Sequence, residues 1–381
     1  MSQPWLRRFP SAQQRIDWVE VKRLLSMLNT METRVIKVDP LNPSQEAVRE
    51  AAEVILKGGL VAFPTETVYG LGASSYNPDA VRRIYVVKNR PMDNPSIIHI
   101  ASLEQLYEVA DEVPEDLVNR LRRAWPGPLT VILKKSSRIH PTVSCGLNTV
   151  AVRMPAHPVA LALIKASTPI SAPSANISGK PSPTKAEHVI ADLYGKIELI
   201  LDAGETFFGV ESTIIDFTKK PPVLYRPGPF TIEELRELFG EVKVPDEARG
   251  LGQFNVALAP GMKYRHYAPD KPLIVTECND LDGLVKLTMD TAVDKARRGL
   301  RVLILCSAET CRRYEDAGFK TIQVGSRGNL YTVAKNLFDA LRMVDRLDVD
   351  VAVAEGYPEE GIGLAIMNRL RKASGHTIVR C

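Results

Sequence analysis

The sequence predicts an α/β protein with two domains, and three observations lead to this prediction. The chain has 381 residues, which is longer than a single domain with one hydrophobic core usually is. From residue 34 to about residue 239, short segments rich in β-branched residues alternate with helical segments. A second alternation of strands and helices begins at residue 271. We therefore expect an N-terminal twisted open α/β sheet domain and a smaller C-terminal Rossmann-like α/β domain.

Capping and turn residues place the elements of the first domain. Ser44 suits the N-cap of a helix that Gly58 and Gly59 end, and Pro64 ends the buried strand that follows. Pro78 suits the first turn of the next helix. Helices are expected over residues 45–57, 78–90 and 114–124, and strands over residues 34–38, 60–63, 96–100, 129–134, 149–153, 198–202, 212–217 and 223–225.

The second half of the chain changes character at residue 244. Apolar periodicity disappears over residues 244–270, and aromatic and basic residues crowd together, which indicates a linker that packs on something polar. Gly361-Ile362-Gly363 has too few glycines and no preceding strand for a dinucleotide fingerprint, so helix–sheet packing is the favoured reading. Strands are expected over residues 273–276, 302–305 and 349–354, and helices over residues 292–298, 332–345 and 363–373. The predicted organisation is an extension (1–30), a first α/β domain (31–243), a linker (244–270) and a C-terminal domain (271–381).

Composition limits the class of protein. Hydrophobic residues make up 45% and charged residues 25%, as in soluble globular proteins, and no apolar run approaches the roughly 20 residues of a membrane span. The net charge of +4 permits a weak contact with nucleic acid, tRNA included, but does not argue for one. The cysteine spacing fits neither a disulfide framework nor a zinc site, which predicts a cytoplasmic location. The less favoured alternative is a redox pair between Cys306 and Cys311, which flank a predicted strand-to-helix turn. The cysteines are Cys145, Cys278, Cys306, Cys311 and Cys381.

The first thirty residues stand apart from the domains. Arg7, Arg8 and Arg15 occur there without an acidic residue until Asp17, but no secretory apolar core or small-residue cleavage site follows. An alternative start at Met31, or a dispensable arm, is favoured over a targeting peptide. We assign the extension no function.

Two short polar signatures carry most of the chemistry. Lys88-Asn89-Arg90 follows an amphipathic helix, and Ser174-Ala175-Asn176 lies in a turn-rich segment. Each signature could instead have a purely structural role. Basic residues near a helix C-terminus often only stabilise the helix dipole, and Ser and Asn often only form turns. Together they supply cations, hydroxyls and turn amides, which position reactants and stabilise charge in nucleotidyl transfer. No phosphate-binding P-loop, zinc-protease motif or nucleophile elbow occurs.

Three further residues extend these signatures. Asn94 and His99 repeat amide and imidazole chemistry within a short span of Arg90, although a single histidine is more often a core residue. Arg153 ends a predicted strand. It is either a surface arginine or, in a cleft, a bidentate partner for a carboxylate.

Five segments, in order, resemble the motifs of the threonylcarbamoyl-AMP synthase (YrdC-like) family. Lys-x-Arg followed by Ser-x-Asn is the signature of that family, and the linker and C-terminal domain resemble its long two-domain form. The resemblance implies that residues 31–243 form a YrdC-like catalytic domain. The segments are residues 63–72, 88–99, 171–184, 211–213 and 224–228.

The resemblance implies an activity, substrates and site residues. The family makes threonylcarbamoyl-adenylate from L-threonine, bicarbonate and ATP, with Mg²⁺ on ATP and release of pyrophosphate, and the product goes to the tRNA threonylcarbamoyltransferase machinery. The implied roles are threonine binding for Thr67, His99, Arg153 and Ser212; ATP binding for Arg90, Asn94, Thr149, Ser174, Ser182 and Arg226; and catalysis for Lys88, Arg90, Ser174 and Asn176.

The labile intermediates of that reaction suggest a use for the linker. Carbamates decompose and mixed anhydrides hydrolyse, so the site must exclude water. We expect Tyr264, Arg265, His266 and Tyr267 to form a lid over the nucleotide cleft; the alternative is a structural strap between the domains. Rival functions are a related carbamoyl transfer, an RNA-binding module, and an ATP sensor without turnover.

Overall fold

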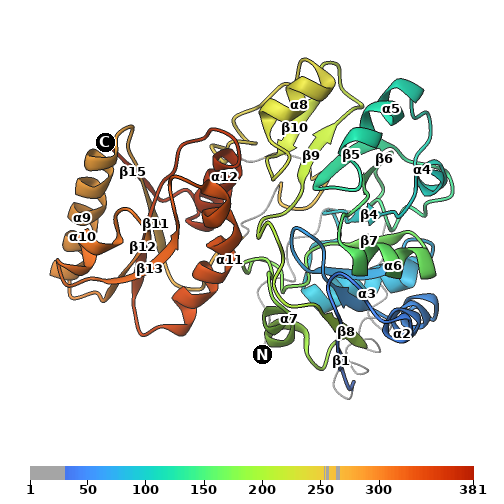
Figure 1. Ribbon diagram of the computed structural model, residues 1–381, viewed down its shortest axis with the longest axis horizontal. Helices are drawn as coiled ribbons and strands as arrows, with labels where there is room; N and C mark the ends of the chain where they lie inside the picture. The colour runs from blue at the N-terminus through green and yellow to red at the C-terminus, as the bar shows by residue number, and fades with distance from the viewer. Residues whose placement is uncertain (1–30, 253, 255–256, 263–266) are drawn as a thin grey trace, which may run out of the picture.

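The computed structural model describes residues 31–252, 254, 257–262 and 267–381. Figure 1 shows two bodies side by side, an N-terminal domain coloured blue to yellow and a C-terminal domain coloured orange to red. The predicted N-terminal extension lies outside the described residues. The expected α/β architecture with two domains is confirmed.

A mixed sheet of ten strands runs through the described N-terminal domain. Both of its faces are buried: Leu60 and Ala62 belong to one apolar cluster, and Val61 and Phe63 to another. This follows from the alternation of side chains along a strand. In spatial order the strands are β1 (Arg34–Lys37), β8 (Leu199–Asp202), β2 (Val61–Phe63), β3 (Gly70–Ser74), β7 (Ile170–Ala172), β4 (Ile97–His99), β6 (Thr149–Arg153), β5 (Leu129–Lys134), β9 (Thr213–Asp216) and β10 (Val223–Arg226).

Two central strands, β3 and β7, were not expected from the sequence. The first contains no β-branched residue, and the second is only three residues long. Small residues are needed in β3 because a Cβ on Gly72 would lie 2.7 Å from the Phe63 ring. Packing against a neighbour, rather than propensity, therefore decides this strand.

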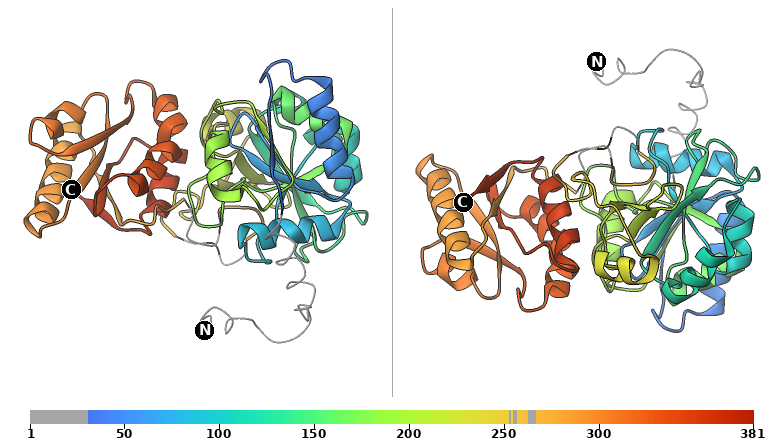
Figure 2. Two further views of the ribbon diagram at one scale, coloured as in Figure 1. Left: turned by 90° about the horizontal axis from the view of Figure 1, so that it is seen from below. Right: turned by 90° about the horizontal axis from the view of Figure 1, so that it is seen from above.

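Helices cover both faces of this sheet (Figure 2). The Ser44 hydroxyl caps α2 by accepting from the Ala47 amide, as predicted. Asn77 caps α3, and Asn89 ends it in the left-handed conformation with φ of 51°. Lys88 is therefore the last helical residue, and the chain turns sharply before Arg90. The helices are α2 (Gln45–Leu56), α3 (Pro78–Lys88), α4 (Leu103–Val109), α5 (Glu115–Ala124), α6 (Pro158–Ala166), α7 (Ala186–Leu193) and α8 (Ile232–Phe239).

The C-terminal domain is a parallel sheet of five strands with helices on both faces. Gly363 opens α12, and a Cβ there would lie 1.9 Å from the Pro358 carbonyl oxygen, so this glycine serves a tight turn. In spatial order the strands are β13 (Lys320–Gly325), β12 (Val302–Ser307), β14 (Val351–Glu355), β11 (Leu273–Glu277) and β15 (Ile378–Arg380), and the helices are α9 (Leu281–Arg297), α10 (Cys311–Glu315), α11 (Leu330–Arg346) and α12 (Gly363–Ala373).

The expectation that the cysteines form no disulfides is wrong. Cys278 pairs with Cys381, and Cys306 pairs with Cys311. The first pair is 103 residues apart in sequence and is brought together by the parallel pairing of β11 with β15. Linear spacing cannot show such a pair, because it depends on which strands become neighbours.

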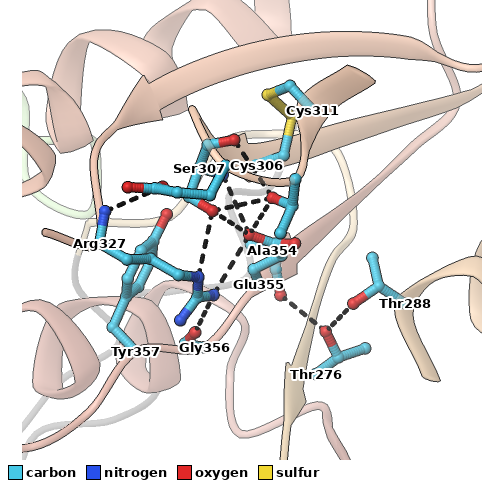
Figure 3. Close-up of polar contacts among 12 residues, drawn as sticks. Thr276, Thr288, Cys306, Ser307, Cys311, Arg327, Ala354, Glu355, Gly356 and Tyr357 are labelled. Carbon is cyan, nitrogen blue, oxygen red and sulfur yellow. Dashed lines mark hydrogen bonds and ion pairs between the residues drawn. A yellow bond between two sulfur atoms is a disulfide. The ribbon is translucent and has the colours of Figure 1, made fainter. Parts of the chain in front are cut away.

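A buried polar cluster lies beside the second disulfide, where β12 and β14 end (Figure 3). The Glu355 carboxylate accepts from the Ser307 and Thr310 hydroxyls, from Arg327 and, at 2.6 Å, from the Tyr314 hydroxyl. Glu355 is completely buried, so these donors compensate its desolvation. The cluster joins the carboxyl ends of two strands within this domain.

The helices α11 and α12 lie on the side of the C-terminal domain that faces the N-terminal domain (Figures 1 and 2). All 11 residues of α12 are buried. None of the helices in the described part of the chain has the length and apolar character needed to cross a bilayer.

Replacing Gly209 with alanine is expected to loosen the contact between the domains. Gly209 has φ of +75°, and a Cβ there would lie 2.3 Å from the Lys335 carbonyl oxygen of α11. Gly204 is the matched control, because its φ of +79° is similar but no atom lies within 4 Å of its Cβ position. We expect Gly209→Ala to lower the free energy of unfolding by about 1–3 kcal/mol more than Gly204→Ala. Equal losses in thermal melts of the two variants would show that the close approach is unimportant.

Candidate active site

A cavity of about 50 Å³ lies where the ends of several central strands meet the linker. Segments far apart in sequence build it: the loop after β2, the ends of β4 and β6, the turn after β7, the residues before β9, and β10. Linker residues form one wall. The predicted site residues that line it are Thr67, Arg90, His99, Arg153, Ser174, Ser212, Arg226 and Tyr267, and the other lining residues include Thr65, Gly70, Glu211, Pro260 and Gly261.

Lys88 joins the two polar signatures directly. Its ammonium donates to the backbone carbonyls of Ser174 and Asn176. The Ser178 amide returns a hydrogen bond of 2.9 Å to the Lys88 carbonyl. Burial, with the nearby Arg90 guanidinium, lowers the Lys88 pKa well below its usual value. The lysine therefore fixes the Ser-x-Asn turn against the end of α3.

Arg90 follows the left-handed turn and enters the cavity wall. Its Nε donates to the Asn94 carbonyl at 2.8 Å, and its Nη2 donates to the Pro95 carbonyl at 3.1 Å. The remaining Nη1 makes no hydrogen bond to a described residue. Asn94 is buried, and its side-chain oxygen has no partner among the described residues. Nη1 of Arg90 is therefore available to a ligand in the cavity, whereas the described residues that line the cavity do not include Asn94.

Arg153, at the end of β6, lies between two residues of the loop after β2. Its Nη1 donates to the Thr67 hydroxyl at 2.8 Å, and its Nη2 lies 2.6 Å from the Glu66 carboxylate. Its Nε donates to the Gly127 carbonyl. All four residues are buried or nearly so. Sequence reasoning missed Glu66, although it lies inside the first recognised motif.

His99 lines the cavity as a neutral imidazole. Burial and the nearby Arg153 charge lower its pKa to about 3. Its Nδ1 lies 3.2 Å from the Ile97 carbonyl oxygen, which sets Nδ1 as the donor and leaves Nε2 as an acceptor. At neutral pH His99 therefore offers a hydrogen-bond acceptor and no charge.

Arg226, on β10, ties the cavity to the linker. Its Nη2 donates to the Ser212 hydroxyl at 3.0 Å, and its Nη1 donates to the Pro260 carbonyl at 3.1 Å. The Ser212 hydroxyl also lies 2.7 Å from that of Thr130. Burial lowers the pKa of Arg226 to about 10. The guanidinium stays charged at neutral pH within a wall of hydroxyls.

Glu211 connects the cavity to the C-terminal domain. One of its oxygens accepts from the Ser182 hydroxyl at 2.6 Å, and the other lies 3.1 Å from Nε of Arg369, on α12. Sequence reasoning quoted Glu211 within a motif but gave it no role, and it missed Arg369. A basic residue on a C-terminal helix is normally read as solvent-exposed, so no sequence signal identified it.

The predicted site residues Asn176 and Thr149 lie in different places relative to the cavity. Asn176 is buried, and its amide donates to the carbonyls of Ile177 and Lys180, so it shapes the turn that Lys88 holds. Thr149 starts β6, four residues before Arg153, and lines a different cavity with Asn148 and Lys134. The structure does not bring Thr149 to the others.

Three of the four predicted lid residues, Tyr264, Arg265 and His266, lie outside the described residues. Tyr267 is described and buried at the cavity wall, with its ring 5.2 Å from that of Phe338 on α11. Burial raises the Tyr267 pKa to about 12, so the phenol is neutral. The lid therefore stays a prediction.

Positive charges outnumber negative charges among the described residues that line the cavity. Three guanidinium groups, from Arg90, Arg153 and Arg226, meet one carboxylate, from Glu211, among the described lining residues. Hydroxyls and turn amides supply the remaining polar groups. Such a cavity favours anionic groups, and its arginine forks match carboxylate and phosphate oxygens.

Comparisons with known proteins cover both domains. The family model described as "Telomere recombination" matches residues 53–228, and the model described as "Threonylcarbamoyl-AMP synthase, C-terminal domain" matches residues 230–375. The threonylcarbamoyl-AMP synthase of Pyrococcus abyssi is 50% identical over 345 residues, covering 87% of this chain and 95% of its own length. That of Bacillus subtilis is 46% identical, covering 90% and 97%.

A solved structure of a related protein is also similar to this chain over both domains. The crystal structure of P. abyssi Sua5 complexed with L-threonine has a TM-score of 0.85 and 48% identity, covering 91% of this chain and 99% of that one. The resemblance inferred from five motifs is confirmed. The chain belongs to the threonylcarbamoyl-AMP synthase family.

Proposed function

We propose that the protein is an L-threonylcarbamoyladenylate synthase, which converts L-threonine, bicarbonate and ATP into threonylcarbamoyl-AMP and pyrophosphate. Family membership over both domains supports this function. The observation that carries it is the convergence of Arg90, Arg153 and Arg226 on one cavity that the Lys88-held turn closes. A neutral amino acid and a polyanionic nucleotide need such a site.

The reaction requires two bond-forming steps. The threonine amine adds to bicarbonate-derived carbon dioxide, which gives a carbamate and, counted from bicarbonate, one water. A carbamate oxygen then bonds to the α-phosphorus of ATP, and the bond from that phosphorus to the bridging oxygen breaks. Pyrophosphate leaves with the bonding electrons. Neither step needs a redox cofactor or an activated side-chain nucleophile.

The threonine side of the cavity is proposed to be formed by Arg153, Thr67 and His99. Two N–H groups of Arg153 are not committed to Thr67, Glu66 or Gly127, and they suit the threonine carboxylate. The unprotonated Nε2 of His99 accepts from the amine or hydroxyl of threonine. Because the pKa of His99 is about 3, this role does not change near neutral pH.

The phosphate side is proposed to be formed by Arg90, Arg226 and the Ser174 turn. These groups stabilise charge that develops as pyrophosphate leaves. Lys88 acts there by fixing the turn carbonyls of Ser174 and Asn176, so that the turn amides keep their direction.

The family implies Mg²⁺ with ATP, but the described residues do not form a protein site for it. Among the described residues, no group of three His, Cys, Asp or Glu side chains is placed to hold a metal ion. The carboxylate of Glu211 is already engaged by Arg369 and Ser182. We propose that Mg²⁺ arrives bound to ATP, with phosphate oxygens and water as its ligands.

The linker is proposed to exclude water from the labile intermediates. Its described residues Pro260, Gly261 and Tyr267 already line the cavity. A cavity of about 50 Å³ is smaller than the several hundred Å³ that ligand sites usually offer. We therefore propose that the described linker residues move away from the cavity to admit substrate and move again to release product.

The product is proposed to pass to the tRNA threonylcarbamoyltransferase machinery. That machinery modifies the adenosine beside the anticodon in tRNAs that read ANN codons. A mixed anhydride hydrolyses in water, so the consuming enzyme must act soon after release. No membrane partner is proposed.

Pyrophosphate release by the purified protein with ATP and Mg²⁺ tests this function. We expect release only when both L-threonine and bicarbonate are present, because the carbamate is the nucleophile. Release without threonine would indicate simple ATP hydrolysis. ATP binding without release would favour the sensor, and tight RNA binding without release would favour the RNA-binding module.

A further inference from the structure

Helix α12 belongs to the C-terminal domain, yet several of its polar side chains bond outside that domain. The Asn368 amide donates to the Ala248 carbonyl at 2.8 Å, and the Lys372 ammonium donates to the Gly261 carbonyl at 2.7 Å. Both acceptors lie in the linker. The helix therefore holds the linker from one side, and it reaches the catalytic domain through Arg369.

Arg369 is a fully buried charge that contacts the N-terminal domain. Its side chain is 0% exposed, and its guanidinium lies 3.1 Å from the Glu211 carboxylate and donates to the Pro227 carbonyl. It also lies 5.7 Å from the Tyr267 ring centre. A buried arginine costs desolvation energy that a well-placed partner must offset, and removing the arginine would leave that partner as an uncompensated buried charge.

That partner is a carboxylate on the substrate side. Burial by itself would raise the pKa of Glu211, but the charges of Arg369 and Arg226 hold it below its usual value, with help from the Ser182 hydroxyl. Glu211 is thus ionised on the wall of a cavity proposed to take ATP. Without Arg369, an incompletely neutralised negative charge would face a polyanion.

We propose that Arg369 is a positioning residue that sets the affinity of the cavity for ATP from the C-terminal domain. It neutralises Glu211 and fixes the carboxylate that holds the Ser182 hydroxyl. The inference rests on the proposed function, because it assumes that the cavity takes ATP. Threonine has no net charge, so its binding depends much less on the charge of Glu211.

Steady-state kinetics of full-length Arg369→Met tests the proposal. We expect the KM for ATP to rise about tenfold or more, with the KM for threonine changed less than about threefold. Arg371→Met is the matched control: Arg371 is also buried on α12 and also contacts the linker, donating to the Arg249 carbonyl at 2.9 Å, but its ion pairs are with Glu277 and Glu359 of its own domain and not with Glu211. We expect Arg371→Met to leave the ratio of the two KM values unchanged.

A second variant separates charge from packing. In Arg369→Met with Glu211→Gln, the uncompensated carboxylate is gone, and glutamine can still accept from Ser182. We expect the double variant to recover most of the ATP affinity, even if Arg369→Met alone does not fold. Failure of this rescue, or equal effects of Arg369→Met on both substrates, would overturn the proposal.

The same assay keeps the two claims apart. If the wild-type protein shows no threonine- and bicarbonate-dependent pyrophosphate release, the proposed function fails. If the wild-type protein is active and Arg369→Met has an unchanged KM for ATP, only the role of Arg369 fails.

Discussion

Replacing Lys88 with methionine is expected to reduce pyrophosphate release by at least about a hundredfold. Methionine keeps much of the side-chain volume but cannot donate to the carbonyls of Ser174 and Asn176. Each buried carbonyl left without a donor costs about 1–3 kcal/mol, so the turn should rearrange. Initial rates, together with a thermal melt, measure both effects.

The control for this variant is Lys57→Met. Lys57 is the C-cap residue of α2, its side chain is 77% exposed, and its ion pair with Glu53 lies on the surface. We expect this variant to keep wild-type activity. A Lys88→Met protein that folds and works at the wild-type rate would show that the lysine is not needed to join the two signatures.

The second large effect is expected from Arg153→Met, which should raise the KM for threonine about a hundredfold, or about 2.7 kcal/mol. The variant loses the proposed carboxylate partner. It also leaves Glu66 without its ion pair and Thr67 without its donor. The KM for ATP should change far less, since Arg153 is proposed to contact threonine alone.

Two further variants make this result specific. Arg123→Met, at an exposed position of α5, should leave both KM values unchanged. Glu66→Gln should preserve threonine binding better than Arg153→Met, because it removes no proposed substrate contact. If Arg153→Met raised the KM for ATP as much as that for threonine, the assignment of the two sides would be wrong.

Most elements of both domains could be predicted from sequence, and the exceptions share a physical cause. Capping by Ser44 and Asn77 is local, so helix starts there are readable. The central strand β3 has weak strand propensity and is decided by packing against Phe63. The pairing of Cys278 with Cys381 likewise depends on strand order. Helix caps depend on residues adjacent in sequence and can be predicted, whereas strand pairing and disulfide pairing depend on the tertiary structure.

The same distinction applies to the candidate site. Lys88 and the Ser-x-Asn turn were recognisable as signatures, but their direct contact spans 86 and 88 residues and appears only in the structure. Glu66 stood inside a recognised motif without a readable role. Arg369 had no local signal at all, because its partner Glu211 lies in the other domain.

The pairing of Glu211 with Arg369 also has a consequence for the newly made chain. The two residues are separated by 158 positions, and the carboxylate is synthesised first. At about 5–20 residues per second, the ribosome needs roughly 8–30 s to cover that distance. During this interval the nascent catalytic domain carries a carboxylate whose counterion does not yet exist. If Arg369 has the proposed role, the cavity therefore reaches its full affinity for ATP only after translation is nearly complete and the last helix has docked.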